Sequence, residues 1–296
     1  MVNNLLIVAL CLIWGATWVA IKIGLSDSPP FYGAAFRFLI ATFTLAIIVS
    51  LGRRKLPKNG RTLVWIVISG LLMYVGSYAV VYYVEQYINA ALASILFASF
   101  PFFVAIGAHF HLDNERLTFM RLIGLVVGFA GVVVVFSGGV TAPETTHWWA
   151  PIVMILSPLT AAVASIIVKR HLTSDDPSSV NFLQMAVGSA ALFALAAGTE
   201  NLTDFHWTAA ATGAVVFLAL FGSVFTFVTY YHLLRTMEAT KLALIAFVTP
   251  LVASLLDYLV LGATLSTATM IGAALVLVGI YLVNIAGARR VRTPAV

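Results

Sequence analysis

Long apolar runs, separated by short polar stretches, dominate the pattern along the chain of 296 residues. A helix needs about 20 apolar residues to cross the hydrocarbon core of a bilayer. The stretches between the runs are short, so little of the chain is left for a separate domain outside the membrane. The pattern therefore predicts an all-α membrane protein with ten transmembrane helices. The runs are 4–25, 31–51, 62–84, 89–109, 119–137, 149–169, 179–199, 208–232, 239–261 and 267–287.

The second half of the chain repeats the pattern of the first half at a distance of 148 or 149 residues. We interpret residues 1–147 and 148–296 as two five-helix repeats that form one integral membrane unit. Because five is odd, the second repeat enters the membrane from the opposite side, which gives an inverted-topology repeat. Corresponding positions are Pro101 and Pro250, Gly124 and Gly272, Gly131 and Gly279, and the pairs Tyr82-Tyr83 and Tyr230-Tyr231.

Composition places the chain in lipid. It is 61% hydrophobic and 9% charged, and its mean hydropathy is +1.04, whereas soluble domains have about 25% charged residues. Such a chain cannot cover its own surface with polar groups. Cys11 is the only cysteine, which excludes an internal disulfide. The first apolar run has no basic segment before it, so we interpret it as a retained span rather than a secretory signal.

Basic residues predict the orientation. With the N-terminus in the cytoplasm, the inner loops hold 14 of the 16 Lys and Arg residues and the outer loops hold none. Lys22 and Arg37 are the two that fall inside spans. We therefore expect a multi-pass protein of the cytoplasmic (inner) membrane with both termini in the cytoplasm. The formal charge of +5 comes from these loop residues, which face the inner surface of the lipid bilayer. We therefore expect the bilayer, and no nucleic acid, as a partner.

Three blocks carry a resemblance to a known family: LIWGATWVAIKIG, ERLTFMRLIGLVVGFAGVVVV and GATLSTATMIGAALVLVGIYL. They resemble EamA-type members of the drug/metabolite transporter superfamily, and the whole chain is most similar there to YddG-type exporters of aromatic and other amino acids. The resemblance implies a central cavity lined mainly by spans one, three, four, six, eight and nine. One departure concerns the Gly-Glu-x-Leu pattern of the family, because Gly262 is followed here by Ala263. The first repeat keeps its acid, Glu115.

Span one carries Trp14, Trp18 and Lys22 at intervals of four residues, with Thr17 beside them. This spacing places them on one stripe of a helix. Tryptophan in the middle of a span either packs against other helices or faces a cavity. Lys22 either extends to the interface or attracts the carboxylate of a substrate in the cavity.

Span three carries Tyr74, Tyr78 and Tyr82 at the same spacing, and span eight carries Thr226 and Tyr230. Aromatic stripes often serve packing alone. A hydroxyl in hydrocarbon nevertheless needs a partner, and a wet cavity supplies one. We therefore assign these residues, with Trp14, Thr17, Trp18 and Lys22, to a substrate cavity.

Two charged residues lie deep in spans, Arg37 in span two and Asp257 in span nine. Their depths from the outer face are similar, so they are candidate partners, and an unpaired charge at such depth is costly. They form either a fixed ion pair or an outer gate, in which Asp257 could also take up protons.

Pro101 and Pro250 interrupt spans four and nine, where each removes a backbone hydrogen bond. We interpret them as hinges or as packing inherited by both repeats. The glycines of spans five and ten predict close helix packing. Gly124 and Gly128 also fit a dimerisation motif, although the pattern is compatible with a monomer.

No metal or cofactor site is expected. His109, His111, Asp113 and Glu115 cluster in a short cytoplasmic turn, where residues two apart point in different directions. The chain lacks a nucleophile elbow, a phosphate loop and a zinc-protease motif. We therefore expect no enzyme activity, and a structural membrane protein without substrate remains as a third interpretation.

The leading hypothesis is a secondary transporter that exports small amino acids or related metabolites by alternating access through a central hydrophobic cavity. Aromatic amino acids are favoured, mainly because of the resemblance. The alternative is a broader exporter of drugs or cationic metabolites, with or without proton coupling. That alternative needs a buried acid in the cavity, and Asp257 is the candidate.

Overall fold

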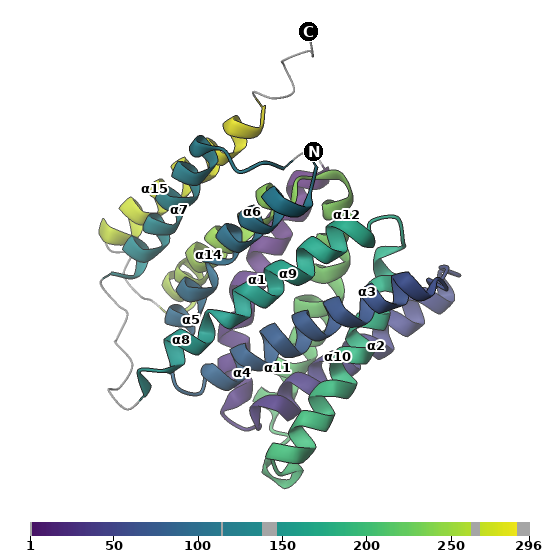
Figure 1. The fold of residues 1–296 in the computed structure, drawn as a ribbon. Helices are drawn as coiled ribbons and strands as arrows, with labels where there is room; N and C mark the ends of the chain where they lie inside the picture. The colour runs from purple at the N-terminus through teal and green to yellow at the C-terminus, as the bar shows by residue number, and fades with distance from the viewer. Residues whose placement is uncertain (1, 114, 138–146, 262–266, 289–296) are drawn as a thin grey trace.

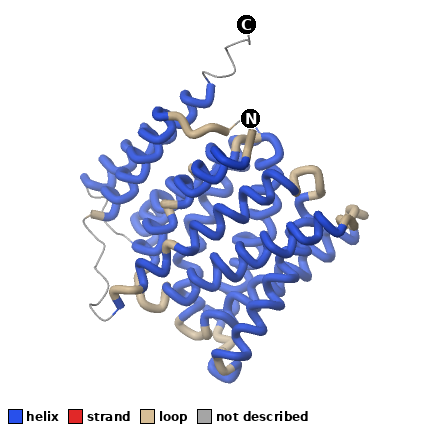
Figure 2. The backbone as a smooth tube through the Cα atoms, viewed as in Figure 1, coloured by secondary structure: helices blue, strands red, loops and turns tan. Residues whose placement is uncertain are grey.

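The computed structural model describes residues 2–113, 115–137, 147–261 and 267–288, and of residues 136, 256–261 and 287–288 the backbone only. Every regular element in this part of the chain is helical (Figure 2). The elements are α1 (Val2–Leu25), α2 (Pro30–Leu51), α3 (Gly60–Gly70), η1 (Leu71–Ala79), α4 (Val80–Val84), α5 (Ala90–Phe97), α6 (Phe100–His111), α7 (Phe119–Phe136), α8 (Ala150–Met154), α9 (Leu156–His171), α10 (Pro177–Thr199), η3 (Leu202–Asp204), α11 (Ala209–Ala219), η4 (Leu220–Phe225), α12 (Thr226–Thr236), α13 (Ala239–Ala243), α14 (Ile245–Leu261) and α15 (Thr267–Ala288).

The helices agree with a multi-pass membrane protein. Eight helical stretches of the described chain are long and apolar enough to cross a bilayer. Two shorter apolar helices, Phe119–Val135 and Ala239–Leu255, lie where spans five and nine are expected. Many apolar side chains of these helices are exposed, among them Phe43, Phe110 and Leu277. A protein surface of this kind is suited to lipid.

Side-chain caps set the starts of several helices. The carboxylate of Asp176 accepts hydrogen bonds from the amides of Ser178 and Ser179, and Pro177 supplies the fixed φ angle of the first turn. A cap also comes from a distant loop, because Glu200 accepts from the amides of residues 31 and 32 at 2.9 and 3.0 Å. These caps satisfy amides that have no partner inside the helix.

Spans three and eight are not regular α-helices throughout. Each contains a π-helical stretch, η1 in the first half and η4 in the second, and their first residues, Leu71 and Leu220, are 149 residues apart. π-helical turns are rare and frequently accompany functional sites. The two stretches therefore mark equivalent irregularities in the two halves.

Spans four, six and nine are also interrupted, at Ala98–Ser99, at Ile155 and at Leu244. Pro101 is the second residue of α6, directly after its interruption. Pro250 lies inside the continuous helix α14, six residues beyond the interruption of span nine. A proline in the first turn of a helix loses no intrahelical hydrogen bond, so Pro101 suits its place better than Pro250 does.

Helices α7 and α15 lie side by side at one edge of the molecule (Figure 1). Glycines allow the two backbones to touch. A Cβ atom added at Gly279 would lie 2.4 Å from the amide nitrogen of Gly128, and one at Gly131 would lie 2.6 Å from that of Val276. The prediction of close packing through these glycines is confirmed, and Gly124 and Gly128 serve it within one chain.

The other helices form a bundle in which elements of the two halves pack against each other. α2 packs on α10, α1 packs on α14, and α6 packs on α9 (Figure 1). These pairs join spans two and seven, one and nine, and four and six. If span one corresponds to span six and span four to span nine, the contact between spans one and nine corresponds to the contact between spans four and six, which is compatible with the predicted repeat. The buried core draws residues from all six of these helices.

Candidate functional site

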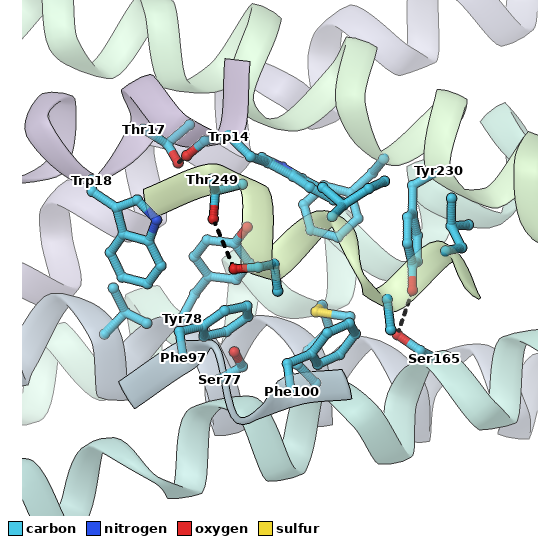
Figure 3. Close-up of a pocket in the computed structure, with 18 of the residues that line it drawn as sticks. Trp14, Thr17, Trp18, Ser77, Tyr78, Phe97, Phe100, Ser165, Tyr230 and Thr249 are labelled. Atoms are coloured by element: carbon cyan, nitrogen blue, oxygen red, sulfur yellow. Dashed lines mark hydrogen bonds between the residues drawn. The ribbon is translucent and has the colours of Figure 1, made fainter. Parts of the chain in front are cut away.

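A pocket lies between the two halves, with about 720 Å³ of space that no atoms fill, including the part open to its surroundings. Figure 3 shows the side chains that surround it. The lining residues come from spans one, three, four, six, eight and nine, as the family resemblance implied.

Aromatic rings form much of the wall. Trp14 packs against Phe227 and Tyr230, with ring centroids 5.8 and 5.4 Å apart. Trp18 lies edge-to-face with Phe97 at 5.5 Å. Such mutual contacts hold the rings at fixed angles, so the wall offers preformed faces and edges to another aromatic group.

A few polar atoms interrupt this apolar wall (Figure 3). The hydroxyl of Tyr230 lies 3.5 Å from the Oγ of Ser165. Ser77, which also lines the pocket, shares a hydrogen bond of 2.9 Å with Ser157. Thr17 donates to the carbonyl of Trp14 at 2.7 Å, whereas the indole Nε1 of Trp14 is buried without a hydrogen-bond partner.

No charged side chain lines the pocket among the described residues. Its side-chain polar groups are hydroxyls and the indole N–H groups of Trp14 and Trp18. A wall of this kind suits a solute that is apolar or carries no net charge, because an isolated charge would lose hydration without gaining a partner.

One cation lies directly behind the wall. Arg37 is fully buried, and its guanidinium carbon lies 4.7 Å from the ring centroid of Tyr78, which lines the pocket. Its nitrogens donate to Ser223 Oγ at 2.9 Å, to the carbonyl of Gly222 at 3.0 Å and to Tyr82 Oη at 3.5 Å. The side chain of Asp257 lies outside the described part, so its pairing with Arg37 stays a prediction.

The structure separates the residues assigned to the cavity into two groups. Trp14, Thr17, Trp18, Tyr78 and Tyr230 line the pocket. The remaining four are not among its lining residues. They are Lys22, Tyr74, Tyr82 and Thr226.

Each of these four residues has a place behind the wall or at its end. Tyr74 is fully buried, and its ring centroid lies 4.6 Å from that of Phe38. Tyr82 contacts the guanidinium described above. Thr226 is fully buried, and its hydroxyl has no hydrogen-bond partner. Lys22 is exposed and donates from Nζ to the backbone carbonyls of Glu85 and Ile88, the latter at 3.3 Å.

The contact of Lys22 has a counterpart in the second half. Lys169 Nζ donates to the carbonyls of Leu234 and Met237, at 2.5 and 2.9 Å. The two lysines lie at opposite ends of the bundle, at the last turns of α1 and α9 (Figure 1). Lys22 of span one thus binds carbonyls at the end of span three, and Lys169 of span six binds carbonyls at the end of span eight. Carbonyls at the end of a helix have no partner within the helix.

Sequence reasoning missed several wall residues. Phe97 and Phe100 line the pocket, but a phenylalanine within an apolar run gives no contrast that could single it out. Ser165 and Thr249 also line it. A hydroxyl in the middle of a span is a usable signal, the same one that pointed to the tyrosines.

A bundle of apolar, span-length helices with a pocket in its interior is typical of small-molecule transporters. The profile of the EamA-like transporter family matches residues 1–137 and again residues 148–285. The chain therefore belongs to the EamA-like transporter family.

Individual relatives agree with this assignment. The chain is 27% identical over 96% of its length to "Uncharacterized transporter YoaV" of Bacillus subtilis and covers 97% of it. It is 28% identical over 94% of its length to "Uncharacterized inner membrane transporter YedA" of Escherichia coli, covering 89% of that protein. A chloroplastic WAT1-related protein of Arabidopsis thaliana is 28% identical, over 92% of this chain and 66% of that protein. The family and the relatives YoaV and YedA are described as transporters.

A solved crystal structure shares the fold. It superposes with a TM-score of 0.78 at 21% identity, over 98% of this chain and 99% of that chain.

Proposed function

We propose that the protein is a secondary transporter of the inner membrane that exports small, largely apolar amino acids or related metabolites, with aromatic ones favoured. Both termini face the cytoplasm in this proposal. Two inverted five-helix repeats enclose the pocket and open it to either side in turn, by alternating access.

The observation that carries the proposal is the pocket wall. Rings of Trp14, Trp18, Tyr78 and Phe227 offer stacking and edge contacts, and hydroxyls beside them can orient a small polar group. A solute with an aromatic ring and a small polar group matches the chemistry of this wall. Arg37 behind Tyr78 adds a positive potential that favours a carboxylate over an amine.

The alternative, an exporter of cationic drugs or metabolites, is less well supported. It requires an acid in the cavity, and no acidic side chain lines the described pocket. The substitution Asp257→Asn distinguishes the two. It should abolish the transport of cations if the alternative holds, and it should leave phenylalanine efflux unchanged if the amino acid proposal holds.

The proposal is tested with purified protein in liposomes loaded with labelled phenylalanine, threonine or methionine. Efflux is followed with and without a pH gradient. We expect efflux of at least one of the three, with phenylalanine fastest. A failure to move any of them would overturn the proposed substrate class.

Matched variants connect transport with the pocket. Ala161 lines it, so Ala161→Phe should fill it and stop efflux, and Trp14→Ala should slow efflux of phenylalanine more than that of threonine. Trp148 is 67% exposed and is not among the lining residues, so Trp148→Ala should leave efflux unchanged. Equal effects of all three variants would contradict transport through this pocket.

A further inference from the structure

Glu85 lies directly after α4, whose last residue is Val84, and yet its side chain is completely buried, at 0% exposure. It follows the predicted span 62–84 and precedes the span 89–109, in a loop expected on the outer side. Both of its carboxyl oxygens are buried, and neither has a hydrogen-bond partner in the structure. Buried polar groups are nearly always paired, so a carboxyl group without partners requires an explanation.

The two nearby cations do not donate to the Glu85 carboxyl. Lys22 directs its ammonium to backbone carbonyls, including the carbonyl of Glu85 itself. Arg37 directs its nitrogens to Tyr82, Ser223 and a further carbonyl. An ionised carboxylate without donors is costly in such surroundings. Burial without donors therefore favours the neutral, protonated form of this carboxyl group.

The charged and titratable groups around Glu85 come from several elements. Lys22 approaches from α1, Arg37 from α2 and Tyr82 from α4 itself. α8 packs against α4 and has no ionisable residue. The ionisable residues of α9 lie in its last turn, at the other end of that helix. Burial raises the pKa of the Glu85 carboxyl well above its usual value, and the charges of Lys22 and Arg37 oppose this only in part.

The position of Glu85 connects it to the pocket. Val81 lines the pocket, and Glu85 lies four residues further, one helical turn towards the end of the span on the same face. On span one, Trp18 lines the pocket and Lys22 likewise lies four residues further, towards the end of the span. The carboxyl group therefore lies between the solute pocket and the aqueous end of the bundle.

We propose that Glu85 is a proton-binding site that couples movement of the solute to a counterflow of protons. This inference rests on the proposed transport function and adds the coupled ion to it. Water at the open outer end supplies the proton, which binds to a carboxyl oxygen and neutralises the group before it is buried. When the pocket opens to the other side, the same proton leaves to water there, and the carboxylate is restored.

The sign of the pH effect follows from the raised affinity for the proton. A hydrated glutamate has a pKa of about 4.3. The arrangement with Glu85 buried is therefore fully favoured below that pH. Its advantage is lost as the pH rises through the raised pKa of the buried carboxyl group. A single proton changes the balance between the buried and hydrated arrangements by at most about tenfold per pH unit.

The first experiment detects the proton without transport. Infrared difference spectra of the purified protein, recorded during a pH titration, should show the band of a protonated carboxyl group near neutral pH. The band should be absent in Glu85→Gln and present in Asp204→Asn, since Asp204 is an exposed carboxylate at the end of η3. A wild-type protein without this band, or a band that survives Glu85→Gln, would overturn the proposal.

The second experiment measures coupling in liposomes that carry labelled phenylalanine and a pH-sensitive dye. Wild-type efflux should depend on pH by up to about tenfold per unit and should move protons inward. Glu85→Gln should keep efflux down the solute gradient and lose both effects. Equal pH dependence of wild type and Glu85→Gln would refute coupling at this residue. If the infrared band is present but no solute moves, the proton site stands and the proposed transport function fails.

Discussion

Arg37 and Gln184 occupy the same position, the eighth residue, in α2 and α10, and each contacts a tyrosine hydroxyl of its own half. Arg37 donates to Tyr82 Oη at 3.5 Å, and Gln184 Oε1 accepts from Tyr231 Oη at 2.8 Å. The two tyrosines are 149 residues apart. The two contacts correspond in position, but the partner of Tyr82 is the cation of Arg37 and the partner of Tyr231 is the neutral amide of Gln184.

Removal of the Arg37 side chain should destabilise the fold. Arg37→Ala leaves Ser223 Oγ and the carbonyl of Gly222 without their donor, and it opens a cavity at a fully buried site. We expect a loss of roughly 2–4 kcal/mol, measured as a lower unfolding temperature in detergent. Arg37→Gln, which imitates the second half, should lose less.

Arg54 provides the control for this prediction. Its ion pair with Asp176 is partly exposed, so Arg54→Ala should cost no more than about 1 kcal/mol. Equal losses in Arg37→Ala and Arg54→Ala would show that the buried network contributes nothing specific.

The contact between α7 and α15 predicts an asymmetry between two glycines. Gly279→Ala places a methyl group 2.4 Å from a backbone nitrogen of the facing helix, so the helices must separate, and we expect a loss of roughly 1–3 kcal/mol. Gly213→Ala meets no atom within 4 Å. It should stabilise α11 by about 0.5–1 kcal/mol. Unfolding temperatures that move in the same direction for both variants would contradict this packing.

Glu115 should contribute to stability as a cap. It is 4% exposed and accepts hydrogen bonds from the amides of Ala239 and Thr240, at 2.8 and 3.0 Å. Glu115→Ala leaves both amides of α13 unpaired and should cost about 1–3 kcal/mol. Asp113→Ala, at an exposed position of the same turn, should change the unfolding temperature little. Equal behaviour of these two variants would argue against the cap.

The same cap explains why the departure at Ala263 matters. In the first half, the acid before Leu117 joins the turn between spans four and five to the start of span nine. The second half has alanine after Gly262. These two residues lie outside the described part of the structure, but alanine has no carboxylate with which to make such a cap.

Much of the fold could be predicted from the sequence, because hydrophobic runs of span length have one main structural solution. The interruptions within spans could not. The residues of η1 and η4 are as apolar as their neighbours, and only the packing of the helices decides where the winding changes.

The candidate site could be predicted in part. Trp14, Trp18 and Tyr230 are conspicuous within apolar spans, and they line the pocket. The register of the repeat was wrong by one residue at the tyrosines, because Tyr82 is the counterpart of Tyr231 by its contacts. Each half has two adjacent tyrosines, so residue identity alone cannot show whether Tyr82 corresponds to Tyr230 or to Tyr231. The hydrogen-bond partners of the tyrosines can.

The π-helical stretches place a constraint on how this family can change over time. Each residue of an α-helix turns the chain by about 100°. Deletion of one residue within η1 would restore a regular helix, but it would also rotate everything beyond it, including Val81 and Glu85, relative to the rest of span three. We therefore expect insertions and deletions to be tolerated in the loops and rejected within η1 and η4, whatever side chains they carry.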